Sequence, residues 1–194
     1  NTITTNGSFG NGIALLTNSD LNNIINNTVI TSGSGSHGIY LWDTDFSNFT
    51  RNIINTTGTG SGLYLFRDSV GNVFSDNIIL ESGASGIILD TESGLYPENN
   101  TFVNNSFNNI AGYDFYIVDV GINGSWLVDQ PVSSYYINDS IVYFKDSNYG
   151  MVEFLEGING TGINLSKDIQ ITSNLISVNS SQSGLNKSAN LTLY

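Results

Sequence analysis

A four-residue pattern recurs at an almost constant interval through the first half of the chain. Gly is followed by Ile or Leu, a variable residue and Leu at 12–15, 38–41, 62–65 and 86–89, with starts 26, 24 and 24 residues apart. Residues 114–117 form a degenerate fifth copy. A period of 20–50 residues is typical of repeat proteins, in which each repeat buries its apolar face against the next. The chain is therefore predicted to be a solenoid in which one turn, here called a rung, takes about 24 residues.

A second pattern, Asn-x-(Ile/Phe)-x-x-Asn, lies within the same repeats. It spans 1–6, 22–27, 72–77 and 100–105, and it is one residue shorter at 48–52. Asn suits corners because it tolerates a left-handed backbone, and its amide can bond to an Asn one rung away. Short bursts of alternating apolar residues between such corners are typical of strands. We expect an all-β fold, with residues 1–122 forming a right-handed parallel β-helix of about five rungs. Its predicted interior stack is Ile13, Leu15, Ile39, Leu41, Leu63, Leu65, Ile87 and Leu89.

Composition supports this fold and excludes several partners. Asn, Ser, Gly and Thr number 28, 25, 21 and 16, yet 39% of the 194 residues are hydrophobic, so the chain has enough apolar surface to fold. A net charge of -12 repels nucleic acids and anionic lipids. The longest apolar runs last only a few residues, which predicts no membrane insertion in this segment. The absence of Cys removes disulfides and thiolate chemistry.

The combined repeat resembles a known family of folds. Read together, the two patterns are similar to Gly-Ile-x-Leu-x-x-Ser-x-x-Asn-x-Ile-x-x-Asn-x-Ile, the repeat of pectate-lyase-like and NosD-like parallel β-helix proteins, over about residues 1–120. The resemblance implies the architecture. It leaves function open, because such β-helices serve as lyases, glycosidases, adhesins, copper-delivery proteins and fibres.

The regular spacing ends near residue 123. Tyr-rich alternation follows at 135–137, 141–144 and 150–155, and we expect residues 123–194 to form either degraded rungs or a small, irregular β domain. The spacing at 168–179 suggests that the solenoid continues there. The ending, 185–194, resembles the C-terminal segments of large archaeal surface proteins with β-helix regions.

Glycosylation sequons, Asn-x-Ser/Thr, are about twice as frequent as expected by chance from the Asn, Ser and Thr content of the chain. From Asn123 onward, 7 of 9 Asn residues head one, which favours an extracellular or cell-surface glycoprotein over accidental enrichment. The candidate sites are Asn6, Asn26, Asn48, Asn55, Asn99, Asn104, Asn123, Asn138, Asn159, Asn164, Asn179, Asn186 and Asn190.

Aromatic residues gather on one predicted outer face. Since alternate residues point outward, Ala14, Tyr40, Tyr64, Ile88 and Tyr116 form one column, and Leu16, Trp42, Phe66, Asp90 and Val118 form the next. An outward patch of Tyr40, Trp42, Tyr64 and Phe66 beside Ile88 is rarely left bare on a soluble protein. Residues 123–194 or the insertion near Pro97 could cover it, another subunit could contact it, or sugars could stack on it.

Charged residues follow the same strands. Asp68 and Glu92 would stand one rung apart, near the carboxylate spacing of a retaining glycosidase. Asp43 and Asp90 could bind calcium, and Arg67 could act as the base of a lyase. Asp43 beside Arg67 is more simply a surface ion pair. His37 is the only His and has no Cys nearby, which argues against a copper role of the kind the NosD resemblance implies.

These observations predict a non-enzymatic structural protein. Residues 1–6 match the rung motif, and 190–194 alternate without a terminating turn, so both ends of the solenoid need a cover. Longer native sequence could supply it, but we favour pairing with copies of the chain, head to tail, in a filament. The alternative is a carbohydrate-binding or polysaccharide-degrading β-helix. No cofactor is expected, apart from the calcium considered above.

Overall fold

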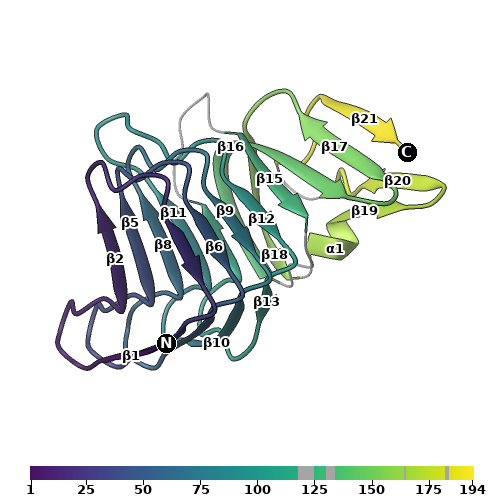
Figure 1. The fold of residues 1–194 in the computed structure, drawn as a ribbon. Helices are drawn as coiled ribbons and strands as arrows, with labels where there is room; N and C mark the ends of the chain where they lie inside the picture. Colours follow the sequence, from purple (N-terminus) through teal and green to yellow (C-terminus); the bar gives the residue numbers. More distant parts are fainter. Residues whose placement is uncertain (118–124, 130–133, 164, 182–183) are drawn as a thin grey trace.

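The structure, a computed structural model, describes residues 1–117, 125–129, 134–163, 165–181 and 184–194. Its first part is a coil of short parallel strands arranged in three sheets, with each rung contributing one strand to each sheet (Figure 1). Sheet A contains β1 (Thr2–Thr5), β4 (Thr28–Thr31), β7 (Ile53–Thr56), β10 (Ile78–Ser82) and β13 (Ser106–Phe107). Sheet B contains β2 (Ile13–Leu16), β5 (Ile39–Trp42), β8 (Leu63–Phe66), β11 (Ile87–Asp90) and β14 (Phe115–Ile117). Sheet C contains β3 (Asn23–Ile25), β6 (Asn48–Thr50), β9 (Val73–Ser75), β12 (Thr101–Val103) and β15 (Ser125–Asp129).

The interior is a set of stacked apolar columns. In sheet B, Ile39, Leu63 and Ile87 stand opposite one another in register, as do Leu41, Leu65 and Leu89, and all six are fully buried. Ile13 and Leu15 continue these columns but are only partly buried, because β2 has one neighbouring strand. The predicted parallel β-helix and its interior stack are therefore confirmed. Sheet C adds Phe49, Phe74 and Phe102, whose rings stack with centroids 4.6 and 5.1 Å apart.

A buried asparagine ladder fixes one corner of the coil. The Oδ1 atom of Asn77 accepts the backbone N–H of Asn52 at 2.9 Å and its side-chain N–H at 3.0 Å. The same two bonds link Asn27 to Asn52 and Asn77 to Asn105. Each amide thereby satisfies backbone groups that would otherwise be buried without partners. The predicted ladder is confirmed.

Left-handed backbone occurs at the exposed residue just before each ladder position. Asn26, Arg51, Asp76 and Asn104 have φ between 52° and 56°. Asn was expected to supply both the ladder and the left-handed turn. The structure divides these roles between neighbours, so the exposed position also accepts Arg and Asp.

The coil ends in one long strand that belongs to two sheets. β16 (Ser134–Asp146) pairs in parallel with β14 through residues 135–137 and with β15 through 141–144. Its other side pairs in antiparallel fashion with β17 (Gly150–Phe154) and β18 (Ile158–Ile163), and β17 also pairs with β21 (Ala189–Leu193). Parallel pairing thus continues past residue 122 to Phe144 before antiparallel strands cover the coil (Figure 1).

A short helix and a hairpin complete the C-terminal part. α1 (Leu165–Asp168) leads into β19 (Ile169–Thr172), which pairs in antiparallel fashion with β20 (Leu175–Val178). The expectation that 168–179 forms another rung is wrong. Only residues 173 and 174 join the two strands, whereas a parallel connection needs a dozen residues or more.

Within the described parts of the chain, no helix has the length and apolar character needed to span a membrane.

Candidate functional site: the outer face of sheet B

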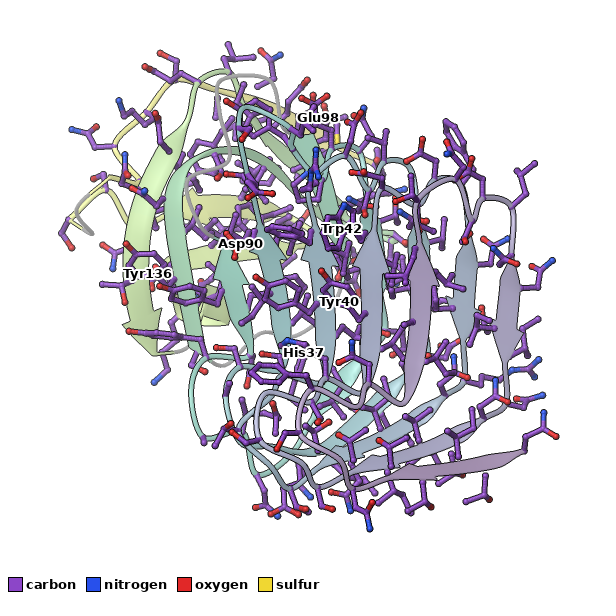
Figure 2. All side chains as sticks on the ribbon, turned by 90° about the vertical axis from the view of Figure 1, so that its left-hand side faces the viewer. His37, Tyr40, Trp42, Asp90, Glu98 and Tyr136 are labelled. Carbon is purple, nitrogen blue, oxygen red and sulfur yellow. The ribbon has the colours of Figure 1, made fainter. Side chains whose placement is uncertain are left out.

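Because the strands of sheet B pair in register, their outward-facing side chains line up in straight columns. The first column contains Tyr40, Tyr64, Ile88, Tyr116 and Tyr136, each opposite the next and each half-buried. The second column contains Trp42, Phe66 and Asp90. Its expected next member, Val118, lies outside the described residues. Figure 2 faces this surface and shows Asp90 between the region of Tyr40 and that of Tyr136.

Five rings form what we call the aromatic cluster: His37, Tyr40, Trp42, Tyr64 and Phe66. The Tyr40 and Tyr64 ring centroids are 5.6 Å apart at 27°, and His37 lies 4.4 Å from Tyr64. Trp42 and Phe66 meet edge to face at 5.6 Å. The sequence placed four of these rings together. His37 was missed as a member because it precedes the strand, at a corner where alternation gives no direction.

A second group, the tyrosine cluster, consists of Tyr113, Tyr116 and Tyr136. Tyr116 and Tyr136 stack with centroids 4.8 Å apart at 19°, and Tyr113 lies 5.8 Å from Tyr116. Tyr116 was expected in the column, but Tyr113 and Tyr136 were not. The alternation at 135–137 would have revealed Tyr136, had the rung been followed past its change of spacing.

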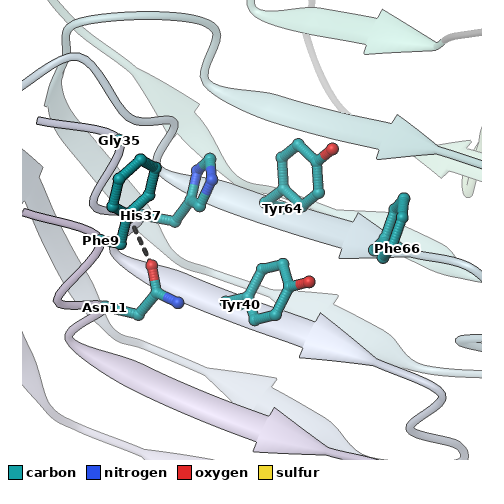
Figure 3. A pocket seen from close by; sticks show the side chains of 7 residues that line it. All are labelled: Phe9, Asn11, Gly35, His37, Tyr40, Tyr64 and Phe66. Carbon is teal, nitrogen blue, oxygen red and sulfur yellow. Dashed lines mark hydrogen bonds between the residues drawn. The ribbon is translucent and has the colours of Figure 1, made fainter.

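A hollow of about 300 Å³ opens beside the aromatic cluster. Figure 3 shows Tyr40 and Tyr64 side by side on adjacent strands, with their ring faces turned toward the viewer. The hollow is lined by Phe9, Asn11, Gly35, His37, Tyr40, Tyr64 and Phe66. Small-molecule sites typically begin at this size and combine apolar rings with a few polar groups.

His37 is held by a chain of side-chain acceptors that runs from rung to rung. Its backbone N–H donates to Asn11 Oδ1 at 2.8 Å, and its own Nδ1 accepts the backbone N–H of Ser61 at 3.0 Å. Burial lowers the pKa of His37 from 6.5 to about 4. The imidazole is therefore neutral at physiological pH, with its remaining proton on Nε2.

Asp90 is tied to the aromatic cluster through Tyr64. The Tyr64 hydroxyl donates to Asp90 Oδ2, and the backbone N–H of Thr91 donates to Oδ1 at 2.8 Å. Burial, together with the bond to Asp90, raises the pKa of Tyr64 far above its ordinary value. Burial also raises the pKa of Tyr40, helped by the nearby carboxylates, of which Asp43 contributes most. Both hydroxyls stay protonated and can donate hydrogen bonds.

Arg67 links the aromatic cluster to the predicted catalytic carboxylates. Its Nε lies 3.8 Å from Asp43 Oδ1 and 3.9 Å from Glu92 Oε2, and its guanidinium carbon lies 5.5 Å from the Trp42 ring centroid. The simple ion pair considered for Asp43 is thus present, with Glu92 as an additional partner. Such half-exposed pairs contribute little stability, typically about 0–1 kcal/mol.

The carboxylates proposed as an acid–nucleophile pair have different surroundings. Glu92 faces Arg67, whereas the backbone N–H of Asp68 donates to Asp43 Oδ1 at 3.3 Å. Burial and the charge of Asp68 raise the pKa of Glu98, from the insertion near Pro97. That insertion lies at the corner beyond sheet B, where the Glu98 carbonyl accepts the N–H of Gly71 at 2.9 Å.

The predicted glycosylation sites fall into three groups. Asn123 and Asn164 lie outside the described residues. Asn55, Asn138 and Asn179 are half-buried, and the Asn179 amide donates to the buried Asp168 at 3.0 Å. The remaining sites are exposed: Asn6, Asn26, Asn48, Asn99, Asn104, Asn159, Asn186 and Asn190.

The three-sided parallel coil with in-register columns defines a β-helix repeat protein. Residues 1–149 match NosD, described as a periplasmic copper-binding protein, and the chain belongs to this family. The family is periplasmic, which places the chain among envelope proteins outside the cytoplasm. No curated protein and no solved structure matches the chain.

The residues of this chain do not fit a copper site. Copper prefers His, Cys and Met ligands, and the sequence has one His, one Met and no Cys. His37 lies in the aromatic cluster with Nδ1 engaged by Ser61, whereas Met151 lies in β17, part of the antiparallel extension. Across the described residues, no three His, Cys, Asp or Glu side chains come together as a metal site. Calcium binding by Asp43 and Asp90 stays a prediction.

Proposed function

We propose that this chain is a non-enzymatic β-helix protein of the cell surface that binds carbohydrate through the outer face of sheet B. The observation that carries the proposal is the pair of outward Tyr rings, Tyr40 and Tyr64, beside a hollow of about 300 Å³. The apolar face of a sugar ring packs on such rings, while its hydroxyls bond to groups at their rim. The aromatic cluster supplies the rings, and the hydroxyls of Tyr40 and Tyr64 together with the Asp90 carboxylate supply the hydrogen-bonding groups at their rim.

The surroundings of the carboxylates favour binding over hydrolysis. A glycosidase needs two carboxyl groups on either side of one glycosidic bond. Glu92 instead faces Arg67, which also contacts Asp43 and Trp42. The polysaccharide-degrading alternative, with Asp68 and Glu92 as the pair and Arg67 or Asp43 assisting, keeps a direct test. If the wild-type protein degrades a polysaccharide and the double variant Asp68→Asn with Glu92→Gln does not, the degrading alternative is correct and our proposal is wrong.

The binding test compares matched tyrosine variants on a panel of immobilised glycans. Tyr40→Ala and Tyr64→Ala should each lower affinity roughly three- to tenfold, the range expected for loss of one aromatic contact. Tyr149→Ala removes an exposed ring at the β16–β17 turn and should leave binding unchanged. Equal binding by all four proteins would refute a site at the aromatic cluster.

N-glycosylation is a separate part of the proposal. It is supported by the exposure of eight sequon Asn side chains on the described surface. Site-resolved mass spectrometry of native material should find sugar at exposed Asn159 and much less at Asn179, whose amide is engaged by Asp168. A mass equal to that of the bare chain would rule glycosylation out.

Head-to-tail assembly is the second candidate function. It is supported by β1, β2 and β3, each of which pairs with a neighbouring strand on one side only in the described chain. A strand edge that no other segment covers favours addition of another chain. Light scattering over a concentration series should then show open-ended growth, and a monodisperse monomer at high concentration would contradict it.

A further inference from the structure

We infer that the ligand of this face is an uncharged, extended glycan that lies along the axis of the solenoid, from the aromatic cluster to the tyrosine cluster. This inference rests on the proposed carbohydrate-binding function and names its ligand class. Its basis is the alignment of two separate aromatic clusters on one column of sheet B, with Asp90 between them (Figure 2).

Spacing along the column suits a polymer with a short repeat. Tyr40, Tyr64, Ile88, Tyr116 and Tyr136 stand on consecutive strands, and neighbouring strands in a sheet lie about 4.8 Å apart. One pyranose unit of an extended glycan is about as long as this spacing. The column therefore offers an apolar contact to each successive sugar, including one at Ile88. A single sugar would use only one of the two clusters.

Charge on the face selects against acidic polysaccharides. Among the described residues, the charges that act on Tyr40 are those of Asp43, Asp90 and Glu92 and of one cation, Arg67. Arg67 is already engaged by two of these carboxylates and by Trp42. The whole chain carries -12, so a uronate chain would meet repulsion both locally and at long range. A neutral glycan meets none.

Hydrogen-bonding groups on the face also match hydroxyl-rich, uncharged ligands. The carboxylate oxygens of Asp90 accept hydrogen bonds, and sugar hydroxyls donate them. The Tyr64 and Thr91 donors use one position on each Asp90 oxygen, and each oxygen has a second lone pair. These two bonds orient Asp90 before any ligand binds, at a position between the aromatic cluster and the tyrosine cluster.

Titration calorimetry with cello-oligosaccharides from disaccharide to hexasaccharide, and with oligogalacturonates of equal length, tests the inference. Affinity should rise with length until both clusters are spanned. Tyr136→Ala should weaken the hexasaccharide roughly three- to tenfold and leave the disaccharide unchanged. Tyr149→Ala is the matched control, and circular dichroism verifies folding of both variants.

The outcomes separate this inference from the function on which it rests. If the disaccharide and the hexasaccharide bind with equal affinity and Tyr136→Ala changes neither, the extended site is wrong, while the proposal of carbohydrate binding stands. Tighter binding of oligogalacturonates would overturn the charge selection alone. If no oligosaccharide binds in calorimetry and no glycan of the immobilised panel binds, both proposals are wrong.

Discussion

Acidification should destabilise this protein through one half-buried side chain, His37. The pKa of His37 is about 4 in the folded chain and 6.5 when unperturbed. Between pH 4 and pH 6.5, therefore, His37 is protonated in the unfolded chain and neutral in the folded chain. The contribution of His37 to stability then falls as pH falls through this window and levels off below pH 4. The shift corresponds to about 3 kcal/mol of unfolding free energy. Protonation at Nδ1 would also abolish its role as acceptor for the Ser61 N–H.

The chain itself supplies the control variant, His37→Asn. One rung earlier, Asn11 Oδ1 accepts the backbone N–H of His37 at 2.8 Å, so an Asn at position 37 can accept the Ser61 N–H in the same way. Such a variant keeps the acceptor chain and removes the titrating group. It should equal the wild type at neutral pH within about 1 kcal/mol.

The assay is urea unfolding followed by circular dichroism, at a series of pH values from neutral to 4. Seventeen carboxylates also titrate toward the acidic end, but they are common to both proteins, and the difference between the two curves removes them. That difference should grow steadily below pH 6.5, in favour of His37→Asn. Parallel curves, or an NMR titration of His37 with a midpoint near 6.5, would refute the burial argument.

Three further substitutions test the interior, and a fourth on the surface serves as a control. Asn77→Ala removes a ladder residue that accepts two hydrogen bonds from Asn52, and urea unfolding should show a loss of about 2–4 kcal/mol; an unchanged midpoint would mean that water replaces the amide. Leu65→Asp places an unpaired charge in the core and should yield no folded protein by circular dichroism, whereas Leu16→Asp, on the exposed side of β2, should fold. Tyr135→Phe deletes the 2.9 Å bond to buried Asp168 and should cost about 1–3 kcal/mol in the same assay, and a gain in stability would show that bond to be unimportant.

The repeating part of the fold was predictable because each rung has the same surroundings as the next. Once Leu41 and Leu65 were assigned to the interior, alternation alone placed Tyr40 and Trp42 outside, and the structure has them there. His37 illustrates what alternation cannot give, since corner residues are positioned by hydrogen bonds such as that to Ser61.

The C-terminal part was less predictable, because its pairings depend on distant residues. The strand residues of β19 and β20 carry the same local spacing as a rung, yet their two-residue turn directs an antiparallel hairpin. Similarly, the left-handed backbone at Asp139 marks a break within β16, but nothing local shows that its two halves belong to different sheets. Sequence periodicity identifies strands well, but strand partners outside a repeat are set by the turns and the packing.

The double membership of β16 has a mechanical consequence. A pulling force on the first rung separates short strands one ladder at a time, because each rung contacts only its neighbours. Force that reaches β16 meets parallel bonds to β14 and β15 and antiparallel bonds to β17 and β18 together. Stretching should therefore unravel the coil from its first rung in small steps, with rupture of the β16 region as the last and largest event.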